Sequence, residues 1–397
     1  MSAYIFTLDS RETLELYAKH GVYATKITRP DSYWAANHLY TLGDYLTMRP
    51  GDLVFFFRDR KIYGIGRLVE FQTPAGSAVA LCNYPRSYLP AARLPSDSSV
   101  LLWDEGDQAD RPWVVFFEPC PCFFKEGLDM DEALDSDVRG VVRALRVFER
   151  VSFMQMTDEE AQLLSDLFVR RFAADITHGC PAGACFAAAH EPVHDRVRRR
   201  LRKLADYDIE AAELVRHYTN RLGRLRSEAV LELWLLDRLT RGAPEVSALL
   251  GDWDYVTHQL RASPAKPVQY MDRIDIFGYQ QASFGTGFRP TTVKYKVAEV
   301  KRGALTGAVG EDTVNQLMRY VDWVTRKEAG GDYSMVDAYL FAHDFSSETL
   351  AYVRGRALRE FVFQRRPSVS RTWHQVALLR YRYDPGPARL VLDQVYP

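Results

Sequence analysis

Apolar and polar positions alternate through much of the first 170 residues, a pattern typical of half-buried β-strands. The stretch YIFTL opens with this alternation, and MRPGDLVFFFRDRKIYGIGRLVEF (48–71) places a charged RDRK turn between two apolar runs. This arrangement predicts a β-hairpin. Further along, RVFERVSFMQMTDEEAQLL (146–164) predicts a strand followed by a helix, because Thr157 and Glu160 have the spacing of a capping box.

The pattern becomes helical and basic from about 173 to 224, and HGCPAGAC (178–185) marks the change. Beyond this segment the elements follow in a clear order. The chain predicts a helix at 225–239, strands at 272–279 and 292–301, a helix at 312–327, a strand at 334–345, a helix at 346–363 and a terminal hairpin around 384–387. A strand, a crossover helix and a further strand indicate a mixed α/β sheet with a right-handed crossover.

Composition places the chain among ordinary globular proteins. Its 397 residues predict two or three domains, and 47% of them are hydrophobic and 26% charged. No apolar run approaches the length that spans a bilayer, and the opening MSAYIFTLDSRE lacks the regions of a signal peptide. We therefore expect a cytoplasmic protein without a membrane partner. Five cysteines, an odd number, argue against a disulfide framework.

Charge is distributed unevenly although the net charge is only −1. Between Asp97 and Asp137 there are twelve acidic residues against two basic ones, whereas RVRRRLRK (196–203) carries six basic residues in eight. A segregated charge allows one face to meet phosphates, and Arg199, Arg200 and Lys203 are candidate contacts. The alternative is a set of solvated helix faces.

Acidic side chains continue the apolar stripes of several elements in the C-terminal half. Alternation places Glu299 and Lys301 on the same face of their strand as Val297. Asp275 shares a face with Phe277 on the preceding strand, and Glu228 and Glu232 lie four residues apart on a predicted helix. Carboxylates on a core-facing stripe are costly unless neutralised, and a divalent cation neutralises several at once.

These residues form a coherent set for metal-dependent hydrolysis. Asp275, Glu299 and the backbone carbonyl of Val300 are the predicted ligands of Mg²⁺ or Mn²⁺, with Glu228 or Glu232 acting through a metal-bound water. Lys301 is predicted to orient the attacking water and to stabilise the developing phosphorane charge. E-x-K also occurs by chance at solvated strand ends, so the prediction depends on the whole order of elements.

Residues 225–324 resemble the PD-(D/E)XK nuclease superfamily, in particular its RecB-like and mismatch-endonuclease-like branch. The family pattern of a helical Glu, a strand Asp, an E-x-K strand and a Q-x-x-x-Y helix is matched by Glu228, Asp275, EVK (299–301) and QLMRY (316–320). The resemblance implies a restriction-endonuclease-like α/β fold and Mg²⁺-dependent hydrolysis of DNA, usually by homodimers. It gives catalytic roles to Glu228, Asp275, Glu299, Lys301 and Gln316, and nucleic-acid contacts to Arg302 and Tyr320. The long Gly-rich link between Asp275 and Glu299 departs from the family and leaves Asp272 as a competitor.

The segment MRPGDLVFFFRDRKIYGIGRLVE, followed by LRVFERVSFMQMTDEEAQLL, resembles the PUA-like folds, especially their EVE and YTH-related branch. The resemblance implies a small β-barrel with helices that binds nucleic acid and places a flipped, sometimes modified base in an aromatic cage. Stacking on aromatic faces suits such a pocket. The candidates are Trp34, Tyr33, Tyr40, Trp103 and Trp113, with Trp34 first; the alternative is an ordinary aromatic core.

A cysteine and histidine cluster lies at the start of the basic segment. Cys180, Cys185, His190 and His194 approach the spacing of a zinc knuckle without matching a common pattern. Structural Zn²⁺ is one interpretation, and reduced residues of a linker are the other. Cys120 and Cys122 are expected to pack as small apolar groups.

The sequence thus predicts an α/β multidomain protein with a PUA-like reader at 1–172, a basic helical linker at 173–224 and a PD-(D/E)XK nuclease at 225–397. The predicted function is metal-dependent cleavage of DNA, used to restrict modified or foreign DNA such as that of phage. Repair of mismatched or damaged DNA is the second interpretation. A catalytically silent nucleic-acid-binding protein is the third, although Asp275, Glu299 and Lys301 are all present.

Overall fold

The computed structural model of the chain describes residues 2–28, 32–90, 97–104, 110–137, 142–146, 152–203, 206–262, 272–287, 289–302, 309–387 and 389–396. The chain divides into two compact units, Met1–Ile209 and Glu210–Pro397. The division falls inside the predicted linker at 173–224. Each unit is described by itself.

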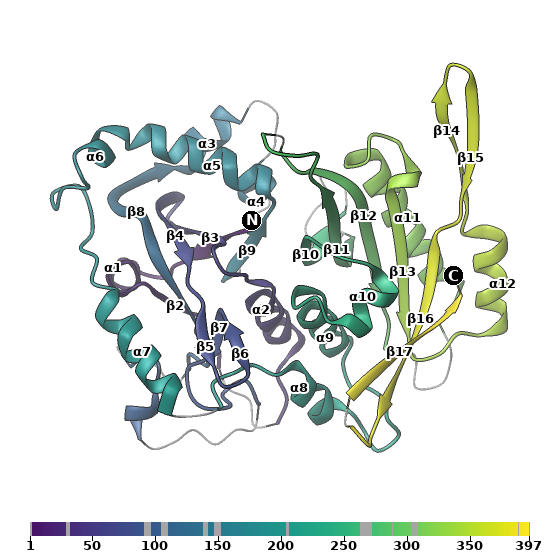
Figure 1. The fold of residues 1–397 in the computed structure, drawn as a ribbon, viewed down its shortest axis with the longest axis horizontal. Coiled ribbons are helices and arrows are strands. Elements are labelled where there is room, and N and C mark those ends of the chain that lie inside the picture. Colours follow the sequence, from purple (N-terminus) through teal and green to yellow (C-terminus); the bar gives the residue numbers. More distant parts are fainter. Residues whose placement is uncertain are drawn as a thin grey trace. The chain divides into compact units, whose positions relative to one another are not determined.

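Unit 1 is built on a curled sheet (Figure 1). Its strands are β1 (Ala3–Thr7), β2 (Val22–Ala24), β3 (Leu53–Arg58), β4 (Lys61–Leu68), β7 (Ala80–Cys82), β8 (Trp113–Asp129) and β9 (Phe153–Met156). The order is β2-β8-β4-β3-β1-β9, with β7 also pairing β8. Only β1 and β3 are parallel among the described pairs of this sheet. The predicted strands and the mixed α/β class are confirmed, but β9 and β2 end the described path, so it does not close into a barrel.

The predicted hairpin forms between β3 and β4. Asp59 and Arg60 make its two-residue turn, and both have positive φ angles, 48° and 60°, as a type I′ turn requires. In β4, a Cβ on Gly64 would lie 2.0 Å from the ring of Phe123, so this strand needs glycine for close packing.

Helices and a short hairpin complete unit 1. They are α1 (Arg11–His20), α2 (Ala36–Thr47), α3 (Met130–Ser136), α4 (Arg143–Arg146), α5 (Asp158–Arg171), α6 (Ala173–Thr177), α7 (Glu191–Lys203) and the β5 (Phe71–Thr73) and β6 (Gly76–Ala78) pair. The capping box predicted for α5 is confirmed, since Thr157 and Glu160 bond each other's backbone N–H groups.

Unit 2 is a mixed sheet with helices. The strands are β10 (Tyr255–Arg261), β11 (Arg273–Ala282), β12 (Thr291–Val300), β13 (Val336–Ala342), β16 (Val376–Asp384) and β17 (Arg389–Tyr396), paired in that order. The helices are α8 (Ala211–Tyr218), α9 (Glu228–Thr240), α10 (Pro244–Leu250), α11 (Glu311–Lys327) and α12 (Ser347–Arg356). As predicted, β12 and β13 are parallel and α11 lies between them in the chain. Apolar side chains of α11 such as Val314, Leu317 and Val321 join the core beside the sheet.

One element prediction is wrong. The helix expected at 346–363 ends at Arg356, and a hairpin of β14 (Arg359–Arg365) and β15 (Ser368–Trp373) follows (Figure 1). The base of this hairpin is held by Arg359, whose guanidinium donates to both carboxylate oxygens of Asp322 at 2.8 and 2.9 Å. The local sequence is compatible with a continued helix. The bidentate ion pair between Arg359 and Asp322 favours the extended conformation instead.

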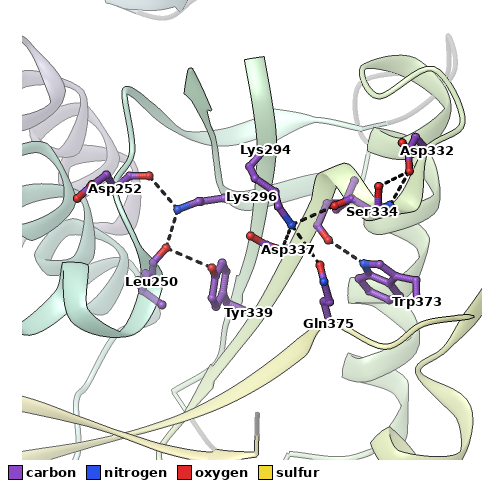
Figure 2. A network of polar contacts seen from close by, with 11 residues as sticks. Leu250, Asp252, Lys294, Lys296, Asp332, Ser334, Asp337, Tyr339, Trp373 and Gln375 are labelled. Atoms are coloured by element: carbon purple, nitrogen blue, oxygen red, sulfur yellow. Dashed lines mark hydrogen bonds and ion pairs between the residues drawn. The ribbon is translucent and has the colours of Figure 1, made fainter. Parts of the chain in front are cut away.

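A buried polar network fixes β12 from the face opposite Glu299 (Figure 2). The Nζ of Lys296, which is 2% exposed, donates to the carbonyls of Leu250 (2.6 Å) and Asp252 (2.8 Å). Lys294 donates to Asp337 at 2.9 Å. Burial lowers the pKa of Lys296, and the two carbonyls satisfy its ammonium. The strand that carries Glu299 is therefore anchored to the end of α10 and to β13. No helix in the described part of the chain is long and apolar enough to span a membrane.

Candidate active site

Asp275, Glu299 and Lys301 meet where β11 and β12 run side by side. Ile276 pairs with Ala298, so the neighbouring residues Asp275 and Glu299 are adjacent. The backbone N–H of Val300 donates to Asp275 Oδ2 at 2.8 Å. Lys301 Nζ lies 2.5 Å from Glu299 Oε1 and 3.9 Å from Asp275 Oδ2. The register thus favours Asp275 over Asp272 as the strand carboxylate.

The two candidate glutamates of helix α9 have different partners. Glu232 is 2% exposed, and its Oε2 accepts a hydrogen bond from Gln259 Nε2 at 3.0 Å. Glu228, at the first position of α9, accepts from the backbone N–H of Arg302 at 3.1 Å. Glu232 therefore faces the carboxylates, whereas Glu228 holds the segment that leaves β12.

Gln259 is a site residue that the sequence analysis missed. Its Nε2 lies between Glu232 and Asp275, 3.4 Å from Asp275 Oδ1. It has a positive φ of 51°, and the unbroken register of β10 and β11 on either side of it (His258 with Ile276, Leu260 with Ile274) places it opposite Asp275. The strand YVTHQLR was not predicted, although its alternation of Tyr255, Thr257 and Gln259 was the available signal.

Helix α11 brings Gln316 and Tyr320 to the site. Gln316 Nε2 donates to the Tyr320 hydroxyl at 2.9 Å, and Tyr320 is 2% exposed. Burial, together with the nearby charges of Glu299 and Asp275, raises the pKa of Tyr320 to about 12 despite the hydrogen bond from Gln316. The predicted pair thus lies within electrostatic reach of the carboxylates.

The carboxylates are too crowded to be ionised together without a compensating cation. Burial and the charge of Asp275 raise the pKa of Glu299 to about 8 and that of Glu232 to about 8. Burial also raises the pKa of Asp275, against the opposing effect of Lys301. Burial by itself would lower the pKa of Lys301. The negative charges of Glu299 and Asp275 have the larger combined effect, so the pKa of Lys301 is raised. Lys301 therefore stays protonated and neutralises part of the cluster.

A hard divalent cation fits this donor set. Glu299 is 0% exposed, and its Oε2 has no hydrogen-bond partner among the described residues. A buried carboxylate oxygen without a partner is costly, and an oxygen-preferring ion would satisfy it. The side-chain oxygens of Asp275, Glu299 and Glu232 are not gathered within 4.8 Å of one another. An ion held directly by Asp275 and Glu299 would therefore reach Glu232 through a water molecule.

The predicted grouping of two cysteines with two histidines is wrong. Cys180 is joined to Cys122 by a disulfide, and the Cys122, Cys180 and Cys185 sulfurs lie within 4.8 Å of one another. His194 instead bonds the Gly21 carbonyl at 3.1 Å, and burial lowers its pKa to about 4. His190 packs beside His194. The expectation that the cysteines form no disulfide, and that Cys122 only fills apolar space, is corrected as well.

The aromatic candidates of unit 1 are mostly buried. Trp34 is 3% exposed, and its indole Nε1 donates to the Tyr88 carbonyl at 2.9 Å. Its ring centroid lies 5.4 Å from that of Trp113, which is fully buried like Trp103. Tyr33 is 38% exposed. This burial is what the aromatic-core alternative predicts for Trp34, Trp103 and Trp113, and it leaves Tyr33 as the exposed ring of the set.

The basic candidates differ in exposure. Arg199 and Lys203 lie on the exposed face of α7. Arg200 is 3.9 Å from Asp104, which also contacts Arg196 at 2.9 Å. Part of the acidic run at 97–137 thus neutralises part of α7. In unit 2, Arg302 donates to the Arg226 carbonyl at 2.8 Å.

Comparison with known proteins gives limited similarity. No protein-family model matches the chain, and no curated protein matches it either. An Agrobacterium tumefaciens protein of known structure is 13% identical, with a TM-score of 0.23 over 41% of this chain and 90% of that chain. A Pseudomonas putida protein is 19% identical, with a TM-score of 0.22 over 42% of this chain and 98% of that chain. Human THYN1, solved in complex with DNA containing 5-methylcytosine, is 17% identical, with a TM-score of 0.23 over 42% and 97%. These scores carry no conclusion about the acidic site.

Proposed function

We propose that the protein is a metal-dependent DNA endonuclease in which unit 1 selects the DNA and unit 2 hydrolyses it. The observation that supports this most strongly is the buried Glu299, one oxygen of which contacts Lys301, while the other has no hydrogen-bond partner within the described ranges of the chain. In a surface salt bridge both side chains would be exposed, whereas Glu299 is completely buried beside the carboxyl groups of Asp275 and Glu232.

Each residue has a role in the proposed reaction. Asp275, Glu299 and the Val300 carbonyl would hold Mg²⁺ or Mn²⁺, which supplies Lewis-acid stabilisation of the scissile phosphate. Lys301 would hold the attacking water and offset charge that develops on the phosphate. Glu232 would orient a metal-bound water, and Glu228 would keep the Arg302 backbone in place. Gln316 and Tyr320 would contact the phosphate from α11.

Unit 1 is proposed to be the reader. The proposal rests on the PUA-like sequence pattern and on the β3–β4 hairpin that this pattern predicted. A DNA partner with modified bases would make the protein a restriction enzyme against foreign DNA. A mismatch preference would instead favour repair. Homodimerisation, implied by the nuclease resemblance, is part of the same proposal and is checked by light scattering of the full chain.

Cleavage assays test the proposal. Plain, mismatched and 5-methylcytosine-containing duplexes are incubated with the chain in Mg²⁺, in Mn²⁺ and in chelator. 5-Methylcytosine is a convenient first modified base because THYN1 was solved with it. We expect metal-dependent cleavage, and a loss of about 100-fold or more in Glu299→Gln and Lys301→Met.

Glu311→Gln is the matched control, because Glu311 is an exposed acid in the first turn of α11. It should cleave like wild type. Cleavage at the wild-type rate by both site variants would contradict the proposal. DNA binding without cleavage by the wild-type chain on every substrate would favour the silent binding protein.

A further inference from the structure

Three cysteines of unit 1 come together from distant parts of the chain. Cys122 lies in β8, and Cys180 and Cys185 lie in the loop between α6 and α7. Their sulfurs are all within 4.8 Å of one another, and Cys185 Sγ is 3.7 Å from Cys122 Sγ. A disulfide engages only two of the three, Cys122 and Cys180. The third thiol is therefore held beside the pair without being needed for it.

Backbone hydrogen bonds position the loop on β8. Lys125 N donates to the Ala184 carbonyl at 2.8 Å, and Phe186 N donates to the Phe123 carbonyl at 2.8 Å. Phe124 and Cys185 form an isolated antiparallel bridge between them. Within the loop, Cys185 N donates to the Pro181 carbonyl at 2.9 Å. The position of Cys185 thus does not depend on a bond between sulfurs.

We propose that Cys122, Cys180 and Cys185 are the protein's ligands for a thiolate-preferring divalent cation, Zn²⁺, when the Cys122–Cys180 bond is reduced. With Zn–S bonds of 2.3 Å, two sulfurs of a tetrahedral site lie about 3.8 Å apart. The 3.7 Å between Cys185 and Cys122 is close to that edge. Cys122 and Cys185 are 7% and 3% exposed, so the ion would be shielded from water on that side.

One basic and one acidic side chain act on the cluster. Three thiolates and one Zn²⁺ carry a net charge of −1. The ammonium of Lys125 is held over the same loop, where it donates to the Ala182 carbonyl at 2.6 Å and to the Gly183 carbonyl at 3.3 Å. This cation offsets part of that charge. Burial raises the pKa of the Cys185 thiol, and the Asp175 carboxylate, acting in the opposite sense to Lys125, raises it further.

The chemistry balances with one named reductant. A trialkylphosphine and one water convert the disulfide to two thiols, and the phosphine becomes its oxide. Binding of Zn²⁺ by the three thiols then releases three protons to the buffer. This site is independent of the acidic cluster in unit 2, so its test does not depend on nuclease activity.

The test uses the full chain, reduced with a phosphine under nitrogen and then given Zn²⁺ or Co²⁺. We expect about one zinc to be retained per chain after desalting, and thiolate-to-metal charge-transfer absorption with Co²⁺. Cys185→Ser should lose the metal yet still form the Cys122–Cys180 disulfide on oxidation. Cys82→Ser is the control and should retain the metal, because Cys82 is outside the cluster and its serine hydroxyl can keep the contact with the Asp208 carbonyl.

Thiol counting in denaturant separates the two states. Of five cysteines, the disulfide leaves three thiols (five minus two), whereas the reduced, metal-binding chain has five. Circular dichroism shows whether each variant is folded. The Co²⁺ absorption of the wild-type chain tests the proposal even if a variant does not fold. A reduced wild-type chain that retains no zinc and gives no Co²⁺ charge-transfer band would overturn the proposal. Retention of zinc by folded Cys185→Ser at the wild-type level would also overturn it.

Discussion

Glu299 is completely buried, and Lys301 contacts only one of its two carboxylate oxygens. At residue scale this makes the site sensitive to protons and to cations. With Asp275 and Glu232 nearby, either protons or a divalent ion must reduce the negative charge. The closeness of these carboxyl groups therefore accounts both for their raised pKa values and for the proposed metal binding.

The stability of the metal-free chain should fall as pH rises. The carboxyl of Glu299 has a pKa of about 8 in the folded chain against 4.5 for the ordinary group. Between these values the folded state binds a proton that the unfolded state has lost. The stabilising difference is thus fully present below pH 4.5 and is lost as pH approaches 8, at a cost on the order of a few kcal/mol.

Urea unfolding in chelator at pH 5, 6, 7 and 8 measures this dependence. Glu299→Gln should give a flatter profile than wild type, although Glu232 keeps part of the slope. Added Mg²⁺ should stabilise the wild-type chain most at pH 8, where the ligands are deprotonated. Parallel profiles for wild type and Glu299→Gln would show that Glu299 does not carry the shift.

Gln259 should act as a positioning residue for the metal ligands. Its amide bridges Glu232 and Asp275, so Gln259→Ala removes one hydrogen bond that orients each of these carboxylates. We expect the Mg²⁺ concentration for half-maximal cleavage to rise about 10- to 100-fold, with a smaller effect at saturating metal. Gln281→Ala, on β11, is the control for loss of a glutamine and should leave the metal titration unchanged. If Gln259→Ala needed the same Mg²⁺ concentration as wild type for half-maximal cleavage, Gln259 would not position the metal ligands.

At the scale of elements, those with signals in the local sequence could be predicted, and those that depend on tertiary contacts could not. The capping box of α5 was readable because both of its hydrogen bonds lie within four residues. The β14 strand was not, because LREFVF is compatible with a helix and the Arg359–Asp322 pair that anchors it joins positions 37 residues apart. Apolar and β-branched residues such as Val362 only become a strand signal once the partner strand β15 is known.

The α5 cap provides a stability prediction. Thr157→Ala removes the hydroxyl that accepts from the Glu160 N–H and should lower the free energy of unfolding by about 1 kcal/mol. Thr41→Ala is the comparison, because the Thr41 hydroxyl only bonds back to the Asn37 carbonyl within helix α2. It should change the stability by a few tenths of a kcal/mol. If chemical denaturation gave the same loss of unfolding free energy for both variants, the Thr157 cap would not contribute more than an ordinary helix hydroxyl.

At the scale of the whole molecule, the chain is two compact units, Met1–Ile209 and Glu210–Pro397. The basic helix α7 belongs to the first of them. His194 bonds the Gly21 carbonyl, and the rings of Phe71 and Phe116 lie edge-on to its imidazole. A segment that looked like a linker by composition is thus part of the folded body of unit 1.

The two units should separate selection from cleavage. Residues 210–397, expressed alone, contain every residue of the acidic site and should cut plain and modified duplexes with similar rates in Mg²⁺. The full chain should discriminate between them. The measurement is the ratio of cleavage rates on the two duplexes, compared between the full chain and the fragment after circular dichroism shows the fragment folded. The same ratio for both would show that unit 1 is not the reader.

The sequence by itself determined the elements that carry local signals: the β3–β4 hairpin, the α5 cap, the β12–α11–β13 crossover and the E-x-K strand end. These depend on turn chemistry, capping and periodicity within a few residues. It also selected Asp275 and Glu299, because alternation places both on core-facing stripes.

Only the tertiary structure decided which distant groups meet. Gln259 reaches the acidic site because its strand places it opposite Asp275, and Glu232 faces the carboxylates whereas Glu228 accepts from the Arg302 backbone. Cys122 meets Cys180 and Cys185 from 58 and 63 positions away in the chain. The histidines that looked like partners of those cysteines by spacing bond elsewhere. Spacing along the chain limits reach but does not set contacts between separate elements, because those depend on how the sheets and loops pack.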